Sequence, residues 1–593
     1  MSDLDAVLEE LAEVTDPGYP LCTPVGDAYP VYTRNNIGEV MPGVASPATV
    51  ASAVRGLERA YVRTHKRFGL LGADAPEDAW RYLGMFYGRA CIGWSAQMEM
   101  NRRSPGAPWW PWSSKVVARP GIDPASYEKP ASVRVWAADC AARLRAARRL
   151  AAATRELPGR VDDLARRLEA EVARVEGADH RDADLDQLKA EVGRPSMGAE
   201  VLEAHLAVSF LAGAYYAQLE NRVRAWTDLA PGPTATGLLM GLGAIESARS
   251  AAALGQMAVA VAVAPRLAGL LRDGDLDGFA AALDAPADEA ERAVRAERDA
   301  FLATFGHRAV AEAELGSSTW ADDPSELYRS VGRLVATGGV ADRTPEARRA
   351  RLEEELLGRL KGARRGRMLR TLELARRYTM LRERTKSLTV RNGAKRRSLM
   401  REVGRRFAEA GIVEDPSDLS QLTLEDLLAA TPARAGEVRE LVRRRRRAAE
   451  LFARLELPAE TFTAPPRPVL ADAVGAPAPS GAGAEVLTGM GVSPGTFEGV
   501  VQVVGDARAG ADLSGEEVLV APFTDAAWSP LFMLSAAVVV DTGGMISHGA
   551  ILARELGLPA VVNVPGTTEL RSGDRVLVDG DRGTVTVLER VAR

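Results

Sequence analysis

Cysteine and aromatic residues are scarce in this chain. Its 593 residues include three cysteines, Cys22, Cys91 and Cys140, and aromatic residues make up 5% of the composition. Three widely spaced thiols form neither a disulfide framework nor a cysteine metal cluster, and they fit a reducing compartment. The sequence therefore predicts a cytoplasmic protein, and no metal site is expected.

Long hydrophobic runs and a strong net charge are also missing. The formal charge is −5 at pH 7, so no overall basic field attracts nucleic acid or an acidic membrane. The basic run Arg443–Arg447 lies in a helical stretch and indicates a solvated face or a local anion patch. The longest apolar run, Met257–Ala264, is stopped by Pro265 and is shorter than the roughly 20 residues a bilayer needs, which favours a buried core helix. We expect neither a nucleic-acid nor a membrane partner.

What is abundant is helical periodicity. From residue 47 to about 457, Ala, Leu, Glu and Arg dominate, with apolar residues spaced by three and four positions. The stretch Phe86–Trp94 falls within this region and is expected to be a helix containing Arg89 and two glycines, which suggest either close helix approach or room for a ligand. An aromatic loop, 105–112, is either a hydrophobic lid or a substrate-stacking wall. The expected helices are 75–100, 131–175, 200–229, 244–271, 287–305, 345–386 and 432–455.

The last hundred residues have a different pattern. A linker rich in Pro, Ala and Gly covers 463–485, and short β-branched runs alternate with turns after it. The fold class is therefore multidomain, α plus α/β, with a mostly helical domain at 1–462 and a small domain at 486–593. The expected strands are 499–504, 517–521, 536–541, 560–564, 575–579 and 584–588.

The most informative stretch runs from Asp541 to Val562. A buried strand is followed by a Thr-Gly-Gly turn and a short helix, so that His548 stands at a helix start. The positive end of the helix favours a neutral imidazole, which can accept a phosphoryl group, and stabilises the anionic group there. Ser547 can cap the helix, and Gly543 and Gly544 allow close approach. A lone histidine in such a turn is more often a helix cap without chemistry.

The whole string changes that assessment. Thr542-Gly-Gly-x-x-Ser-His-x-Ala-Ile-x-Ala-Arg-Glu-x-Gly-x-Pro-Ala-Val-Val562 resembles the phosphohistidine signature of the swivelling domain in phosphoenolpyruvate-utilising enzymes, including rifampin phosphotransferase. Gly491–Gly495 and Pro522–Leu531 resemble further parts of that domain. One departure is Asn563, where glycine is usual. The resemblance implies a mobile β/β/α domain in which His548 carries a phosphoryl group.

Three other segments resemble the central substrate domain of the rifampin phosphotransferase type. They are Tyr32–Pro47, Phe305–Pro324 and Leu374–Arg384. In the family the second of these lines the acceptor site, so the resemblance makes His307 and Glu312 the first candidates for deprotonating or orienting an acceptor hydroxyl. The alternative is a structural salt-bridge cluster. Further candidates for substrate or phosphate binding are Arg34, Asn36, Glu39, Arg89, Arg308, Glu314, Trp320 and Arg382, together with Thr542, Gly543, Gly544 and Ser547.

The resemblance also implies how the histidine is loaded. In the family an ATP-grasp domain charges the histidine, but no glycine-rich phosphate cradle occurs in this sequence. We therefore expect a split enzyme, similar to the large subunit of phenylphosphate synthase, with ATP and Mg²⁺ bound by a separate ATP-grasp partner. The acceptor is expected to be a small organic molecule, with Trp, Tyr and Met content favouring a hydrophobic or aromatic one. Two alternatives stay open: a phosphorylation-activated dehydratase or condensing enzyme, and a non-catalytic binding or regulatory homologue.

Overall fold

The computed structural model describes most of the chain and divides it into two units. Described are residues 3–25, 30–34, 37–103, 133–177, 183–194, 196–243, 245–309, 311–337, 344–457, 461–463, 465–471, 485–507, 513–524, 528–545, 547–564 and 567–591. The first unit comprises Met1–Ala214, Ala311–Ser317 and Thr385–Gly475. The second comprises Tyr215–Val310, Ser318–Arg384 and Ala476–Arg593. The predicted aromatic loop and most of the predicted linker, 472–484, lie outside the described residues.

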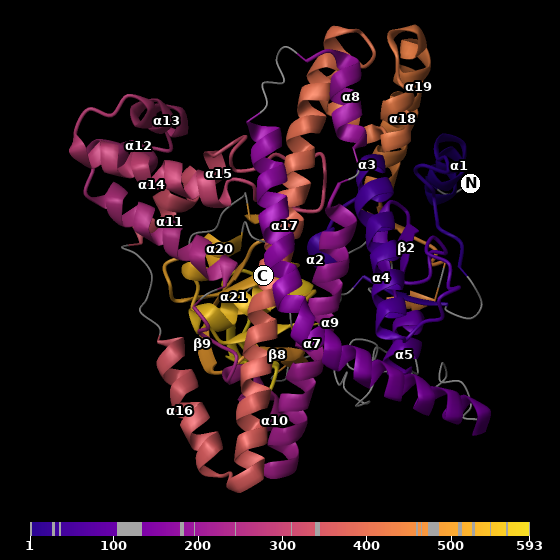
Figure 1. Ribbon diagram of the computed structural model, residues 1–593. Helices are drawn as coiled ribbons and strands as arrows, with labels where there is room; N and C mark the ends of the chain where they lie inside the picture. The colour runs from indigo at the N-terminus through magenta and orange to yellow at the C-terminus, as the bar shows by residue number, and fades with distance from the viewer. Residues whose placement is uncertain are drawn as a thin grey trace. The chain divides into compact units, whose positions relative to one another are not determined.

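The first unit is mostly helical (Figure 1). It contains a small antiparallel sheet in the order β2-β3-β1-β5. Its strands are β1 (Val31–Thr33), β2 (Leu83–Phe86), β3 (Arg89–Gly93) and β5 (Thr461–Thr463), with a separate pair β4 (Leu455–Glu456) and β6 (Val469–Leu470). Its helices are α1 (Asp3–Val14), α2 (Ile37–Val40), α3 (Pro47–Thr49), α4 (Arg55–Phe68), α5 (Trp94–Arg103), α7 (Val133–Glu176), α8 (Leu185–Gly193), α18 (Leu424–Ala429) and α19 (Ala435–Ala453). Helices α9 (Gly198–Trp226) and α17 (Gly362–Glu409) contribute residues to both units.

The prediction of one helix over 75–100 is wrong. Residues 83–93 form a hairpin, β2 and β3, whose turn is Tyr87-Gly88 with φ of 50° and 73°. Two consecutive residues with positive φ make the tight turn that joins two antiparallel strands. The local signal is the Tyr87-Gly88 pair between two short, mostly apolar runs, and the glycines of this stretch do not mark helix packing.

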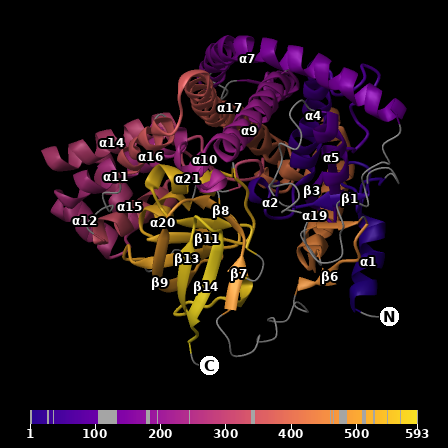
Figure 2. The same ribbon diagram turned by 90° about the horizontal axis from the view of Figure 1, so that it is seen from below.

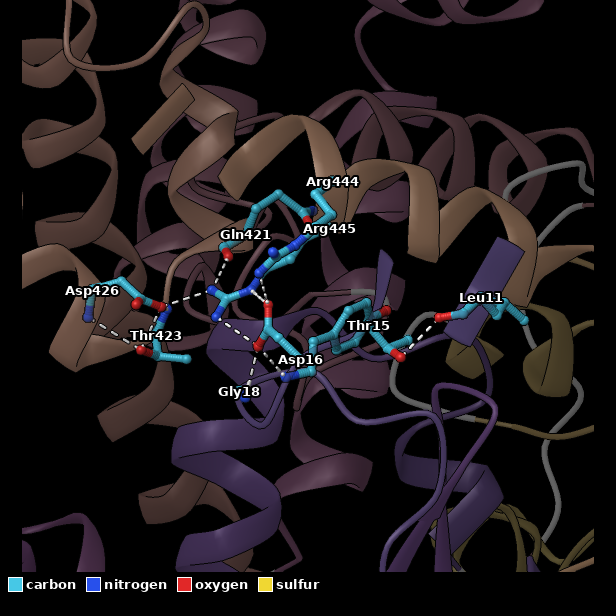
Figure 3. Close-up of polar contacts among 10 residues, drawn as sticks. Leu11, Thr15, Asp16, Gly18, Gln421, Thr423, Asp426, Arg444 and Arg445 are labelled. Carbon is cyan, nitrogen blue, oxygen red and sulfur yellow. Dashed lines mark hydrogen bonds and ion pairs between the residues drawn. The ribbon is translucent and has the colours of Figure 1, made fainter. Parts of the chain in front are cut away.

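Four arginines of the run in α19 are solvated, as one of the two sequence interpretations expects, and the fifth is buried. Arg445 is buried, with its Nε 2.9 Å from Asp16 Oδ2 and its Nη1 2.7 Å from Asp426 Oδ2 (Figure 3). Arg444 also pairs with Asp16, at 3.0 Å. Arg443, Arg446 and Arg447 each have a carboxylate partner as well. The run therefore fastens α19 to the N-terminal segment, and its charges are satisfied within the unit.

The helices of the second unit form two groups. Helices α11 (Glu246–Ala262), α12 (Pro265–Arg272), α13 (Leu276–Asp284), α14 (Glu289–Phe305) and α15 (Ser325–Ala336) pack against one another in a small bundle (Figure 1). Helices α10 (Pro231–Gly237) and α16 (Pro345–Gly358) share a hydrophobic core with parts of α9 and α17. Predicted helices 244–271 and 345–386 are each two helices. Pro265 starts α12, and Gly362, with φ of 53°, starts α17.

The predicted buried helix over Met257–Ala264 is confirmed for one face only. Met257 and Val261 are fully buried, whereas Val259 and Val263 are exposed by 68% and 69%. By length and composition alone, the helical stretch Leu185–Trp226 could cross a bilayer. Core helices of soluble proteins pass the same test, so this is weak evidence, and the absence of a membrane partner stays a prediction.

The C-terminal part of the second unit is built on an eight-stranded sheet in the order β7-β14-β13-β9-β10-β11-β12-β8. Its strands are β7 (Glu485–Thr488), β8 (Met490–Ser493), β9 (Thr496–Val503), β10 (Glu517–Ala521), β11 (Ala537–Val540), β12 (Ala560–Val562), β13 (Arg575–Asp579) and β14 (Thr584–Glu589). The central strands β9 to β12 are parallel. Helices α20 (Ser529–Met533) and α21 (His548–Leu556) lie on one side of the sheet (Figure 2). The predicted fold class, helical with a small C-terminal α/β part, is confirmed.

Replacing Gly88 by alanine should destabilise the first unit. Its φ of 73° disfavours a side chain, and a Cβ there would lie 2.9 Å from both Phe452 and Val44. The positive φ alone costs about 1–2 kcal/mol, so the thermal unfolding midpoint of Gly88→Ala should fall. The control is Gly366→Ala in α17, where nothing lies within 4 Å of the added Cβ. If the unfolding midpoint of Gly88→Ala fell no further than that of Gly366→Ala, the tight turn at Tyr87-Gly88 would be contradicted.

Candidate phosphohistidine site

The carboxyl ends of three neighbouring parallel strands form the base of the site. Strands β10, β11 and β12 pair in register, with Ala521 opposite Val540 and Val540 opposite Val562. Thr524 follows β10, Thr542 follows β11 and Asn563 follows β12. The Thr542 amide donates to the Pro522 carbonyl at 2.9 Å, which joins the first two loops. The edge of the sheet therefore gathers short polar side chains where α21 begins.

His548 is the first residue of α21. Ser547 is extended, with φ of −65° and ψ of 163°, and its Oγ accepts a hydrogen bond from the Ala550 amide at 3.2 Å. This is an N-cap, as the sequence predicts for Ser547. The Ser547 amide donates to the Gly544 carbonyl at 3.0 Å, so Gly544 closes the turn before the helix. The histidine thus stands at the positive end of a nine-residue helix.

The histidine is covered in this structure. Its exposed fraction is 5%, and those of Ser547 and Thr524 are 4% and 3%. A Cβ on Gly549 would lie 2.3 Å from Thr524 Oγ1, so the Thr524 hydroxyl sits directly against the first turn of α21. A ring with this cover cannot meet a donor on another protein unless its surroundings open. Thr524 was not among the predicted site residues, although its position just after a buried strand is a usable signal.

The loops leave no space for larger residues beside the histidine. A Cβ on Gly543 would lie 2.8 Å from Val562 Cβ, which explains the glycine. Asn563 has φ of 53°, a left-handed conformation that glycine adopts freely and that asparagine tolerates better than most residues. The glycine usual at this position is therefore replaced by a residue compatible with the same backbone. Its side-chain Oδ1 is buried and makes no hydrogen bond with the described residues.

Arg554 holds the histidine loop from inside. It is buried, its Nε donates to the Val492 carbonyl at 2.8 Å, and its Nη2 donates to the Met545 carbonyl. Burial lowers the pKa of Arg554 to about 10, with Tyr216 and Glu555 acting in the opposite direction. The guanidinium keeps its positive charge at neutral pH and fixes the segment that leads into Ser547.

Arg382 lies close enough to act on this arginine. Its positive charge contributes to lowering the pKa of Arg554, while the charge of Glu383 raises it. The pair is itself joined by a 2.7 Å contact between Arg382 Nη1 and Glu383 Oε1, and both side chains are largely buried. Helix α17 therefore presents an inward ion pair toward α21 instead of a solvated one. The role of Arg382 in phosphate binding stays a prediction.

Glu555, at the other end of α21, fastens the helix to the helical part of the second unit. Its two carboxylate oxygens accept hydrogen bonds from the backbone amides of Leu242 and Gly243, both at 3.0 Å. Arg348 of α16 makes a parallel contact, donating to the Pro494 carbonyl at 3.1 Å. Burial raises the pKa of Glu555, and the two amides and Arg554 act against that rise. These contacts form what we call the α21 latch, Glu555 with Leu242 and Gly243.

The predicted acceptor residues fall into different parts of the chain. His307, Arg308 and Trp320 belong to the second unit, where the Trp320 amide donates to the Arg308 carbonyl at 2.8 Å. Glu312 and Glu314 belong to the first unit. There, Arg397 Nη1 donates to the Glu312 carbonyl at 2.8 Å, and Glu314 accepts from the Ser46 hydroxyl at 2.6 Å.

The remaining predicted residues also belong to the first unit. Arg34 is buried and donates to the Pro42 carbonyl at 2.9 Å. Arg89 is buried and donates to the Phe452 carbonyl at 3.0 Å. Both guanidiniums have structural partners, and their binding role stays a prediction. Asn36 and the side chain of Glu39 lie outside the described part of the chain. Within the described part, no group of three or more His, Cys, Asp or Glu residues is arranged to hold a metal ion.

Comparison with protein families defines the class of both matched regions. Residues 513–583 match the mobile domain of PEP-utilising enzymes, and residues 205–383 match the fourth domain of rifampicin phosphotransferase. The predicted resemblance to the mobile domain of PEP-utilising enzymes and to rifampicin phosphotransferase is confirmed for these two regions.

Individual relatives agree with these matches. A rifampicin phosphotransferase of Streptomyces sp is 34% identical over 55% of this chain and 38% of that protein. The prodigiosin synthesizing transferase PigC of Serratia marcescens is 34% identical over 51% of this chain and 34% of that protein. An uncharacterised protein of Mycobacterium tuberculosis is 29% identical over 99% of this chain and 64% of that protein. The chain thus spans between about a third and two thirds of the length of these relatives.

The α21 latch should make stability depend on pH. A carboxyl whose pKa is raised by burial binds its proton more tightly in the latched form. The contribution of Glu555 is therefore fully present below its ordinary pKa of 4.5 and is lost as pH rises through the raised value. We expect the unfolding midpoint of the wild type, relative to Glu555→Gln, to fall as pH rises from 4.5 to 8. The exposed Glu589→Gln is the control.

Glu555→Ala should be less stable than Glu555→Gln at every pH in this range. Alanine leaves the Leu242 and Gly243 amides without acceptors. Because Leu242 is half-buried and Gly243 is exposed, the loss should stay below the roughly 1–3 kcal/mol that a fully buried unpaired amide costs. Equal midpoints for the alanine and glutamine variants would show that the latch does not form.

Proposed function

We propose that this chain is the acceptor-plus-carrier component of a phosphotransferase in which His548 is the phosphoryl carrier. The observation that carries the proposal is the position of His548. It is the N-terminal residue of a helix at the polar edge of a sheet, inside a matched mobile domain. Thr524, Thr542 and Asn563 surround that edge with groups able to bind phosphoryl oxygens. Arg554 supplies a nearby positive charge.

The chemistry comprises two transfers. In the first, a neutral ring nitrogen of His548 attacks a phosphorus atom of the donor, an N–P bond forms, and the P–O bond to the leaving group breaks. In the second, an acceptor oxygen attacks the same phosphorus and the N–P bond breaks, which restores the neutral imidazole. The acceptor hydroxyl loses its proton to a base, for which His307 and Glu312 are the candidates. Both transfers depend mainly on positioning and charge stabilisation.

The proposal also assigns the source of the phosphoryl group that His548 receives. We assign the first transfer to a separate ATP-grasp protein that binds ATP and Mg²⁺, as the sequence resemblance implies. Because His548 is 5% exposed, the α21 latch has to open for loading and close again for delivery. A carrier that stays in the same chain as the acceptor site replaces diffusion by a large effective concentration. We propose that the acceptor is a small organic molecule. The Trp, Tyr and Met content of the chain favours a hydrophobic or aromatic one.

A second candidate function is favoured by one of the relatives. The name of the Serratia marcescens protein describes a synthesizing transferase, which supports a reaction in which phosphorylation activates an oxygen for subsequent condensation. The phosphoryl group then leaves as phosphate in a later step. Product mass separates the two: the acceptor gains a phosphoryl group in the first case and is joined to a second molecule with net loss of water in the other.

Loading of His548 is tested with labelled ATP and an ATP-grasp protein. We expect an acid-labile phosphoryl adduct on the wild type and on His307→Asn, and none on His548→Ala, because only His548 accepts the group. His205→Gln serves as a matched histidine control, since His205 contacts Thr385 in the other unit. With acceptor present, the adduct on His307→Asn should persist while that on the wild type is discharged. Full labelling of His548→Ala would refute the proposed carrier.

A further inference from the structure

A surface cavity in the first unit is separate from every residue assigned above. It is small, with about 20 Å³ accessible to a water-sized molecule, and it is partly open to solvent. Glu171 of α7 and Glu191 of α8 line one part of it. Arg194 and Ser196 follow α8, and Lys395 and Arg396 of α17 complete the polar lining. The cavity is therefore polar, and charged groups of both signs meet in it.

The charges that line the cavity do not balance. Lys395, whose side chain is 3% exposed, pairs with Glu171. Glu191 pairs with Arg194 at 3.2 Å and with Arg174. Both carboxylates are thus engaged, and three basic side chains face two acidic ones. The surplus charge belongs to Arg396.

Arg396 makes no hydrogen bond or ion pair with any residue that the structure describes. Burial alone lowers the pKa of Arg396, without an opposing carboxylate. A partly buried guanidinium without a partner is costly, because the group has lost water and gained nothing in exchange. Its planar fork of N–H donors matches the oxygens of a carboxylate or phosphate.

An amide side chain lies one helical turn away. Asn392 is 7% exposed, and the part of it that can bind an anion is its Nδ2 donor, since its Oδ1 only accepts hydrogen bonds. A Cβ on Gly198 would lie 3.0 Å from Asn392 Nδ2 and 3.2 Å from Ser196 Oγ. The asparagine amide, the serine hydroxyl and the first turn of α9 are therefore adjacent, on the same side of α17 as Arg396. All of them can donate hydrogen bonds to an anion.

We propose that this cavity binds a small oxyanion, the phosphate or carboxylate group of a metabolite, with Arg396 as its main ligand and Ser196 as a second donor. The site is independent of the proposed carrier function. It lies next to the segment that holds the predicted acceptor glutamates, since Arg397 follows Arg396 and donates to the carbonyls of Glu312 and Glu314, at 2.8 and 3.2 Å. An anion bound here can therefore stabilise the helical turn that positions that segment.

The test is isothermal titration of the full chain with sodium phosphate, and separately with sodium acetate, against sodium chloride at equal ionic strength. We expect saturable binding of phosphate or acetate to the wild type. Arg396→Gln should bind at least about tenfold more weakly, since a hydrogen bond to a charged group is lost. Arg396→Lys should fall between the two, because it keeps the charge but loses the fork. The preferred anion distinguishes a phosphate ester from a carboxylate.

The matched control is Arg377→Gln, an exposed arginine of the same helix without a partner among the described residues. It should bind as the wild type does. Because Arg396 has no partner among the described residues and its burial is costly, Arg396→Gln should unfold at or above the wild-type temperature in buffer without phosphate or acetate. Equal binding by Arg396→Gln and wild type, no saturable binding of either anion, or a marked loss of stability in Arg396→Gln would each overturn the proposal.

Discussion

One short helix carries both the proposed phosphoryl carrier, His548, and a contact that attaches the C-terminal sheet domain. Its first residue is His548, and near its end Glu555 accepts hydrogen bonds from two backbone amides of the helical part of the same unit. Between them, Arg554 holds the loop that leads into the histidine. Because a helix is rigid over nine residues, a displacement at the latch moves the histidine as well. The position of the imidazole is thus coupled to two hydrogen bonds at the far end of α21.

This coupling gives the buried histidine a physical meaning. A phosphohistidine is protected from water while it is covered, but it cannot be loaded there by another protein. The latch has the properties of a reversible contact, because it consists of a carboxylate whose burial is unfavourable and whose hydrogen bonds compensate part of that cost. Such a contact is strong enough to order the domain and weak enough to be broken.

Much of the C-terminal domain could be predicted from the sequence because its signals are local. The strand before Thr542, the N-cap at Ser547 and a short helix starting at His548 all appear, and the strand predicted over 536–541 is observed over Ala537–Val540. Strands β7 and β8 were not expected, since each is short and pairs with residues far along the chain. The hairpin at Tyr87-Gly88 was read as helix because helical spacing in the flanking sequence outweighed a two-residue turn.

The surroundings of the histidine were harder to predict, because they are formed by residues far apart in the chain. Thr524 lies near the histidine because its strand pairs with the strand before Thr542. Glu555 belongs to the quoted motif, but nothing in the motif indicates its partners Leu242 and Gly243, more than 300 positions earlier. Long-range partners of this kind leave no pattern in a single sequence. The predicted acceptor residues show the limit most clearly, because His307 and Glu312, five positions apart, belong to different units of the fold.

The central claim is that the α21 latch opens when His548 is loaded. The most direct measurement is hydrogen exchange at the amides of Leu242 and Gly243, compared between the free chain and the chain incubated with ATP, Mg²⁺ and an ATP-grasp donor. The account predicts that both amides lose protection during loading while the amides of β10 and β11 keep theirs. Unchanged protection at Leu242 and Gly243 in a chain that is demonstrably being phosphorylated would contradict it.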